Sequence, residues 1–258
     1  MEIPERWPRT VKMLAVDIGG SGLKASVLGP QGDMVTDRVR VPTPYPCSPQ
    51  LLVETLTTLV QPLPSYHRVT VGFPGLVRHG TVIQVPSLSR TKPGGPRDEK
   101  QAALWDGFPL EDALAAAFGK PLILANDADV QGCAVVRGNG FEFVMTLGTG
   151  VGTALFNDGL LLPHIELSHA PFRQGESFDI QLGDAARESV GHKRWNRRVQ
   201  KALVHLEDTL YWDRVYIGGG NAKHLDFDPG PKAEIVPNTA GILGGIKLWQ
   251  MHHSVVRG

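Results

Sequence analysis

The stretch from Asp17 to Lys24 has the residue types of a phosphate-binding loop. An apolar strand-like run ends at Asp17, a turn follows, and a second such run begins after Lys24; the turn holds Gly19, Gly20, Ser21 and Gly22. Glycines have no Cβ, so backbone N–H groups can approach an anion, and the serine adds a hydroxyl donor. Asp17 could hold Mg²⁺ through a water molecule. We predict a β-hairpin over residues 13–28 that binds phosphate, with a ligand-free glycine hairpin as the plainer alternative.

A second stretch of this kind begins about 130 residues later. The strand-like run 143–147 leads into a short glycine turn, and 153–156 resumes the β pattern. The residues of interest are Thr146, Gly148, Thr149 and Gly150. Two such hairpins, each opening one half of the sequence, indicate a duplicated domain with a shared cleft. The repetition favours phosphate binding over two unrelated structural turns.

A carboxylate and an amide follow the buried strand expected over residues 121–125. Asp127 could take a proton from a substrate hydroxyl while Asn126 orients the same substrate. The alternative is an Asx helix cap, because helical spacing continues over 130–136. Both can hold for neighbouring residues, with Asp129 as the cap and Asp127 as the base.

In order and spacing, these motifs resemble those of the ROK sugar kinases, especially the polyphosphate glucokinase branch. The resemblance runs from about Leu14 to Leu248. It implies an α/β protein with a two-lobed, ribonuclease H-like fold, as in the actin and hexokinase-like ATPases, and a central interlobe cleft. It also implies phosphoryl transfer from polyphosphate or ATP to a hexose, glucose being the first choice, with Asp127 as general base and a homodimeric assembly.

The resemblance further implies two sets of contact residues. Donor phosphates would meet the two hairpins and a third glycine turn: Asp17, Gly19, Gly20, Ser21, Lys24, Thr146, Gly148, Thr149, Gly150, Gly218, Gly219 and Gly220. The hexose would meet Asn126, Asp127, Glu166 and His169, and we add Pro74 and Gly75 from their place at the end of a buried strand. The three glycines at 218–220 could equally serve close packing alone.

The sequence departs from the family pattern near His169. Many members carry a cysteine-rich zinc site there, but residues 170–184 contain no cysteine, so a structural zinc is not implied. The usual glycine before the histidine is Ser168, which is tolerated unless that position needs a positive φ. A further sugar-binding glutamate stays unassigned between Glu176 and Glu188, and His164 is expected on the surface or in an interface.

The remaining pattern supplies elements to position these residues. We expect strands over 68–73 and 212–217, helices over 50–60 and 110–118, and a broken helix over 184–210. Pro74 and Gly75 follow the first of these strands, where open α/β sheets place ligands. We expect one α/β lobe over residues 12–125, a second over 126–258 and an N-terminal extension over 1–11.

Two segments concentrate positive charge. The loop 86–101 carries Arg90, Lys92, Arg97 and Lys100, and the start of the long helix carries Lys193, Arg194, Arg197, Arg198 and Lys201. A solvated surface is the default interpretation of each. The sharper alternative is a docking surface for a polyanionic substrate, because Lys and Arg both bind phosphate oxygens.

Composition limits the other functions. The 26 basic and 26 acidic residues balance, with a pI near 7.1, so nucleic-acid or membrane binding has no electrostatic support. Two cysteines, no signal-type leader and no long apolar run favour a cytoplasmic protein. Two other classes stay open: a sugar-binding sensor without catalysis, and a nucleotide-driven protein of the actin or heat-shock type. The first would turn over no donor, and the second would need no sugar pocket.

Overall fold

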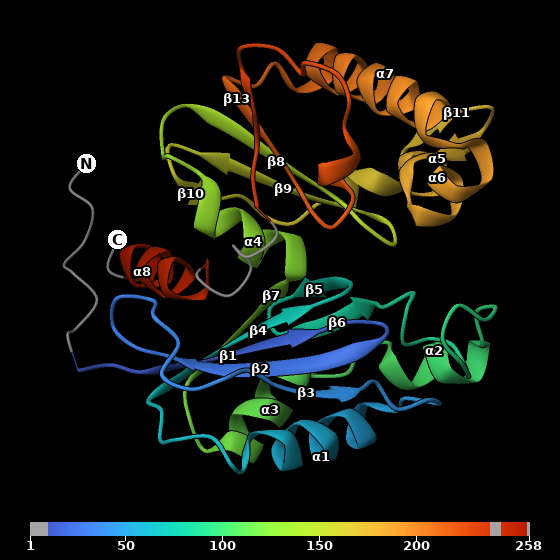
Figure 1. Cartoon of the computed structure of the whole chain (residues 1–258). Helices are drawn as coiled ribbons and strands as arrows, with labels where there is room; N and C mark the ends of the chain where they lie inside the picture. The colour runs from blue at the N-terminus through green and yellow to red at the C-terminus, as the bar shows by residue number, and fades with distance from the viewer. Residues whose placement is uncertain (1–9, 238–243, 257–258) are drawn as a thin grey trace. The chain divides into compact units, whose positions relative to one another are not determined.

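The computed structural model describes residues 10–237 and 244–256 (Figure 1). Contacts divide the chain into two compact units, Met1–Val130 with Ile242–Gly258, and Gln131–Gly241. Each unit contains a five-stranded sheet accompanied by helices, which confirms the α/β class. Most of the expected N-terminal extension over residues 1–11, and the segment 238–243, lie outside the described residues.

The sheet of the first unit combines a hairpin with two parallel strands in the order β3-β2-β1-β4-β7. β1 and β2 are antiparallel, as expected over residues 13–28, whereas β1, β4 and β7 run parallel. The carboxyl ends of these three strands therefore meet at one edge. The strands are β1 (Met13–Ile18), β2 (Gly22–Leu28), β3 (Val39–Pro42), β4 (Arg68–Phe73) and β7 (Leu122–Asn126).

Helices and a small hairpin cover this sheet. Ser48 caps the first helix by accepting the N–H of Leu51 at 3.2 Å, and Gly119 ends the third with a φ of 62°. Fully buried leucines of both helices join the core of the sheet, each adding about 2 kcal/mol by burial. The elements are α1 (Pro49–Val60), β5 (Leu76–Arg78), β6 (Thr81–Gln84), α2 (Glu99–Trp105) and α3 (Leu110–Phe118). The helix α4 (Asp127–Val135) starts in the first unit, and its residues from Gln131 onward belong to the second.

The loop expected over residues 86–101 is corrected at its end, where α2 begins. Asp98 accepts the N–H of Gln101 at 2.9 Å and so caps this helix. Trp105 at its other end is buried and donates from Nε1 to the carbonyl oxygen of Cys47 at 2.9 Å. The sequence did not predict this helix because the buried indole of Trp105, rather than a periodic apolar face, anchors it.

The last helix, α8 (Gly244–Val256), packs on the first unit. Thr70 of β4 donates to the carbonyl oxygen of Gly245 at 3.4 Å, and the guanidinium of Arg68 lies 4.9 Å from the ring centre of Trp249. A Cβ on Gly245 would lie within 3.0 Å of Thr70, so the helix approaches the strand closely. We expected the second lobe to run from residue 126 to the end of the chain. In the structure the contacts assign the C-terminal helix α8 to the first unit instead.

The sheet of the second unit repeats the plan of the first. Its order is β10-β9-β8-β13-β14, in which β8 and β9 form an antiparallel hairpin and β8, β13 and β14 run parallel. This repetition agrees with the predicted duplication. The strands are β8 (Phe141–Leu147), β9 (Val151–Asn157), β10 (Leu160–Leu161), β13 (Arg214–Gly218) and β14 (Ala233–Ile235).

The helix expected over 184–210 is broken, as predicted. Gly191, with a φ of 78°, separates α6 (Asp184–Val190) from α7 (His192–Leu210). Trp195 of α7 is buried and donates from Nε1 to the carbonyl oxygen of Leu182 at 2.8 Å. The remaining elements are the 3-10 turns η1 (Leu167–His169) and η2 (Ala222–His224), the strands β11 (Pro171–Arg173) and β12 (Glu176–Ser177), and the helix α5 (Phe178–Leu182). Over the described part of the chain, no helix has the length and apolar character to cross a membrane.

Candidate active site

The first glycine turn, between β1 and β2, is held through its carbonyl groups. Thr43 Oγ1 donates to the carbonyl oxygen of Gly19 at 2.6 Å, and Tyr45 Oη donates to that of Gly20 at 2.7 Å. Burial raises the pKa of Tyr45, so its hydroxyl keeps the proton that it donates. In a planar trans peptide the next N–H points opposite to the carbonyl. The N–H groups of Gly20 and Ser21 are therefore turned away from these two side chains.

Asp17 and Lys24 face each other across the same hairpin. They are direct partners in the β1–β2 register, and Lys24 Nζ lies 2.9 Å from Asp17 Oδ2. The Asp17 side chain is 45% exposed and that of Lys24 33%, so both can reach a ligand. The pair puts one cation and one carboxylate at the start of the turn, as binding of a metal-phosphate group would require.

Asn126 ties the end of β7 to the turn at Pro74 and Gly75. Its Nδ2 donates to the carbonyl oxygen of Gly75 at 3.1 Å, and its Oδ1 accepts the N–H of Ala128 at 2.8 Å. Asn126 is buried, whereas Asp127 is exposed. These bonds use one of the two amide hydrogens of Asn126, so the second remains for a ligand.

The expected helix cap at Asp129 is wrong. Helix α4 begins at Asp127, so Asn126 occupies the cap position and Asp129 lies buried in the first turn. The Asn126 oxygen reaches the N–H two residues further on, and this starts the helix earlier than the apolar spacing indicated. The exposed Asp127 accepts the N–H of Ala128 with Oδ1 at 2.8 Å, which fixes one of its oxygens.

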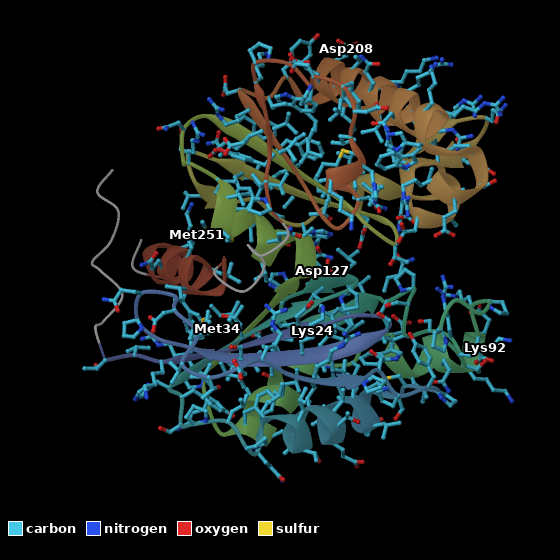
Figure 2. The ribbon with its side chains drawn as sticks, in the orientation of Figure 1. Lys24, Met34, Lys92, Asp127, Asp208 and Met251 are labelled. Atoms are coloured by element: carbon cyan, nitrogen blue, oxygen red, sulfur yellow. The ribbon has the colours of Figure 1, made fainter. Side chains whose placement is uncertain are left out.

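Asp17 and Asp127 flank the same glycine at the carboxyl edge of the first sheet. Gly72 of β4 is the register partner of Asp17 on one side and of Ala125 on the other. A Cβ on Gly72 would lie 3.5 Å from the Cα of Asp127. Two strand spacings put the backbones of Asp17 and Ala125 about 10 Å apart. Lys24 and Asp127 are labelled in Figure 2.

The second glycine turn, between β8 and β9, is held in a comparable way. The N–H of Asp184 donates to the carbonyl oxygens of Gly148 at 3.0 Å and Thr149 at 3.3 Å, and Asn221 Nδ2 donates to Gly148 at 3.1 Å. The N–H groups of Thr149 and Gly150 are therefore turned away from these donors. Thr146 Oγ1 accepts the N–H of Gly152 at 3.2 Å, so it braces the hairpin behind the turn.

The three glycines at the end of β13, residues 218–220, differ in how much space a side chain would have. Gly219 has a φ of 86°, and a Cβ there would lie 2.2 Å from the carbonyl oxygen of Leu147. A Cβ on Gly218 would lie 3.2 Å from Gln131, whereas one on Gly220 would meet nothing within 4 Å. Packing against the second hairpin thus explains Gly219, and open space beside Gly220 leaves room for a ligand.

Glu166 lies between two histidines of the second unit. His164 Nε2 is 3.6 Å from Glu166 Oε1, and His169 Nε2 is 4.0 Å from Glu166 Oε2. His164 was expected on the surface or in an interface, but its side chain is only 6% exposed, against 41% for His169. Sequence reasoning missed it; its place two residues before Glu166 was the available signal. Ser168 is buried in η1 and is not among the residues with positive φ, so its Cβ causes no backbone strain.

The basic loop of the first unit uses part of its charge internally. Arg90 donates to the carbonyl oxygens of Pro86 and Gly95, at 3.1 and 2.8 Å, and Arg97 pairs with Glu99 at 3.0 Å. Lys92 and Lys100 are exposed. These contacts make Arg90 a support of the loop and leave two lysines for any anion.

Asp17 is a suitable magnesium residue although the structure shows no dense metal centre. In the described ranges, no group of three or more His, Cys, Asp or Glu side chains could hold a metal ion. Mg²⁺ ordinarily keeps several waters and binds one or two carboxylates together with substrate phosphates. A half-exposed carboxylate at the edge of a glycine turn fits that requirement.

The strand plan, the paired glycine turns and the motif order define the class of protein. Residues 13–163 match the ROK family model, and this is more than half of the chain. The chain therefore belongs to the ROK family. Its fold is the actin and hexokinase-like ATPase fold of the ROK sugar kinases.

The chain is similar to kinases over nearly its whole length. The polyphosphate glucokinase of Mycobacterium tuberculosis (strain CDC 1551 / Oshkosh) is 27% identical over 246 residues, 89% of this chain and 88% of that protein. The structure of inorganic polyphosphate/ATP-glucomannokinase from Arthrobacter sp. strain KM has a TM-score of 0.77 and 28% identity, covering 94% and 99% of the two chains. A ROK family glucokinase from Streptomyces griseus, in complex with glucose and AMPPNP, has a TM-score of 0.73 and 18% identity over 92% and 98%. These relatives support a sugar kinase.

Proposed function

We propose that this protein transfers a phosphoryl group from polyphosphate or ATP to a hexose, glucose being the first candidate. The observation that carries the proposal is a pair of glycine turns whose carbonyl groups accept hydrogen bonds from supporting residues. Each turn directs two successive N–H groups away from its supporting side chains, at Gly20 and Ser21 in one unit and at Thr149 and Gly150 in the other. Successive N–H groups of this kind suit phosphate oxygens. The polyphosphate-using relatives support the choice of donor.

In this proposal Asp127 takes the proton from the attacking sugar hydroxyl. The residue is exposed at the carboxyl edge of the first sheet, and its Oδ1 accepts the N–H of Ala128. Phosphoryl transfer requires positioning and charge neutralisation more than covalent chemistry. Asp17 would hold Mg²⁺ through water, and that ion would neutralise charge on the donor phosphates. Lys24, beside Asp17, would add a second positive charge.

The sugar-contact residues of this proposal form one set within each unit. In the first unit the Pro74–Gly75 turn and the remaining amide hydrogen of Asn126 would meet sugar hydroxyls. In the second unit the Glu166 carboxylate and His169 would do so. A carboxylate accepts hydroxyl hydrogen bonds in pairs, which would distinguish one hexose from its epimers.

A coupled assay that crosses hexoses with donors tests this function. Glucose, mannose, N-acetylmannosamine and fructose would each be offered with ATP and with long-chain polyphosphate, in the presence of Mg²⁺. We expect turnover with glucose and polyphosphate. Tight sugar binding with no product from any donor would instead support a sensor, and turnover with ATP alone would remove polyphosphate from the proposal.

Two further parts of the proposal come from the sequence. The composition favours a cytoplasmic protein with no nucleic-acid or membrane partner, and the family resemblance implies a homodimer. Light scattering after size exclusion would give the molar mass. A mass of one chain would reject the dimer.

A further inference from the structure

The N-terminal half of α7 carries a charge pattern that works against its own helix. The first ten residues hold five cations, Lys193, Arg194, Arg197, Arg198 and Lys201, and the first turn holds no acid. The acids Glu207 and Asp208 lie toward the other end, where Figure 2 labels Asp208. A helix macrodipole favours the opposite arrangement, and like charges four residues apart repel. The pattern is therefore not explained by helix stability.

Arg173 of β11 adds to this charge from a second element. Arg198 Nη1 donates to the carbonyl oxygen of Gln181 at 3.3 Å, and Arg173 Nη1 lies 3.5 Å from Gln181 Oε1. Partial burial and the nearby Arg173 and Arg194 cations lower the pKa of Arg198, which Glu176 opposes. Among the described residues, no carboxylate lies within 4.0 Å of the charged nitrogens of Arg173, Arg194 or Arg198. Three guanidinium groups thus gather with one acid near them.

The short helix α5 joins this cluster to the second glycine turn. Gln181, on which both arginines converge, is two residues from Asp179, whose Oδ1 accepts the N–H of Val151 at 2.7 Å. Gly183 ends α5, and the N–H of the next residue, Asp184, donates to the carbonyl oxygens of the second glycine turn. A helix of five residues is only about 7.5 Å long. The basic cluster and the turn are therefore supported by the same short segment of one unit.

We propose that Arg173, Arg194 and Arg198 bind the remote phosphates of a long inorganic polyphosphate whose reacting end lies at the second glycine turn. The inference rests on the proposed kinase function. The guanidinium group of arginine binds two phosphate oxygens at once. Polyphosphate carries a negative charge on every phosphate, so it suits a row of cations along a helix. ATP, with three phosphates, has no such tail. The balanced overall charge argues against general nucleic-acid binding.

The test removes two exposed charges and varies donor length. The variant Arg173→Gln/Arg194→Gln keeps Arg198, because Arg198 also supports Gln181. We expect the KM for long-chain polyphosphate to rise severalfold, with the KM values for ATP, short-chain polyphosphate and glucose unchanged. The slope of log KM against log salt should weaken by about 0.7 for each lost contact, the value for single-stranded polyanions. Arg173→Lys/Arg194→Lys should keep most of the affinity.

A matched control removes two charges from the other basic segment. Lys92→Gln/Lys100→Gln should leave the long-chain KM unchanged. An unchanged KM and salt slope in the arginine variant, or a loss confined to the lysine variant, would overturn the proposal. Thermal unfolding of both variants would show that each is folded.

Direct binding separates this proposal from the proposed function. Fluorescently labelled long-chain polyphosphate would be titrated against the wild type and the arginine variant, with single-stranded DNA as a competitor. Binding that weakens in the variant supports the docking site even if no polyphosphate is turned over, in which case only the donor assignment fails. No binding by the wild type, or displacement by DNA at lower concentration than by unlabelled polyphosphate, would reject the site.

Discussion

Asn221 Nδ2 donates to the carbonyl oxygen of Gly148, 3.1 Å away and 73 residues earlier in the chain. The same amide donates to Asp184 Oδ1 at 2.9 Å, and Asn221 is buried. One side chain therefore holds the second glycine turn against the start of α6. The orientation of the outward N–H groups of that turn depends on this link.

Replacing Asn221 by alanine should loosen the turn. The half-buried Gly148 carbonyl and Asp184 carboxylate would each lose a donor, so the free energy of unfolding should fall by about 0.5–1.5 kcal/mol. The KM for the phosphoryl donor should rise while that for the sugar stays close to normal. Denaturant unfolding and donor titrations measure the two effects. Asn139→Ala, at an exposed position, is the control, and equal behaviour of the two variants would contradict the role of Asn221.

Replacing Asp127 by asparagine should remove the base and keep the fold. Asn126 would still accept the N–H of Ala128, so α4 should begin at the same residue. We expect kcat to fall by about 10²- to 10⁴-fold with little change in sugar affinity, measured by initial rates and by calorimetry. Asp112→Asn, an exposed carboxylate in the first turn of α3, is the matched control. Near-normal turnover of the Asp127 variant would exclude it as the base.

Alanine at Gly219 and at Gly220 should have opposite consequences. At Gly219 the new Cβ would collide with the backbone of Leu147 in a left-handed conformation, so we expect a loss of at least about 2 kcal/mol in unfolding free energy. At Gly220 the Cβ has open space, so stability should hold while the donor KM changes. Thermal melts and donor kinetics of the pair are the measurements. If the donor KM of Gly220→Ala is unchanged, the turn over residues 218–220 serves packing alone.

Replacing His164 by alanine should affect the sugar side alone. Its imidazole lies 3.6 Å from one oxygen of Glu166, and its loss would remove one of the contacts that position this carboxylate. We expect the hexose KM to rise severalfold with the donor KM unchanged. His164→Gln, which keeps a polar hydrogen near the carboxylate, should be intermediate. Parallel rises in both KM values would indicate a general structural defect instead.

The buried thiol of Cys47 should make the fold sensitive to alkali. Burial raises its pKa from the ordinary 9.0 to about 12. The folded state then favours the protonated thiol, so this contribution is complete below about pH 9 and is lost as pH rises toward 12. Unfolding free energy measured from pH 8 to 11 should fall less steeply in Cys47→Ala than in the wild type. Rapid alkylation of native Cys47 at pH 8 would contradict its burial.

The sequence by itself determined those features of the protein that depend on residues close together in the chain. The two glycine hairpins, the start of α1 at Ser48 and the end of α3 at Gly119 depend on residues within a few positions of one another. Such short-range patterns need no knowledge of the rest of the chain. A local error, the cap of α4, arose because Asn126 and Asp129 compete for the same role within four residues.

Only the tertiary structure decided how those pieces are supported. Thr43 and Tyr45 hold the first turn from 24 and 25 residues away, Asn221 holds the second from 73, and α8 returns to β4 across 175 residues. The burial of His164 beside Glu166 belongs to this group as well. A hydrogen bond or a packed contact forms between groups that are near in space, and sequence patterns of period two or 3.6 carry no information about which distant segments become neighbours.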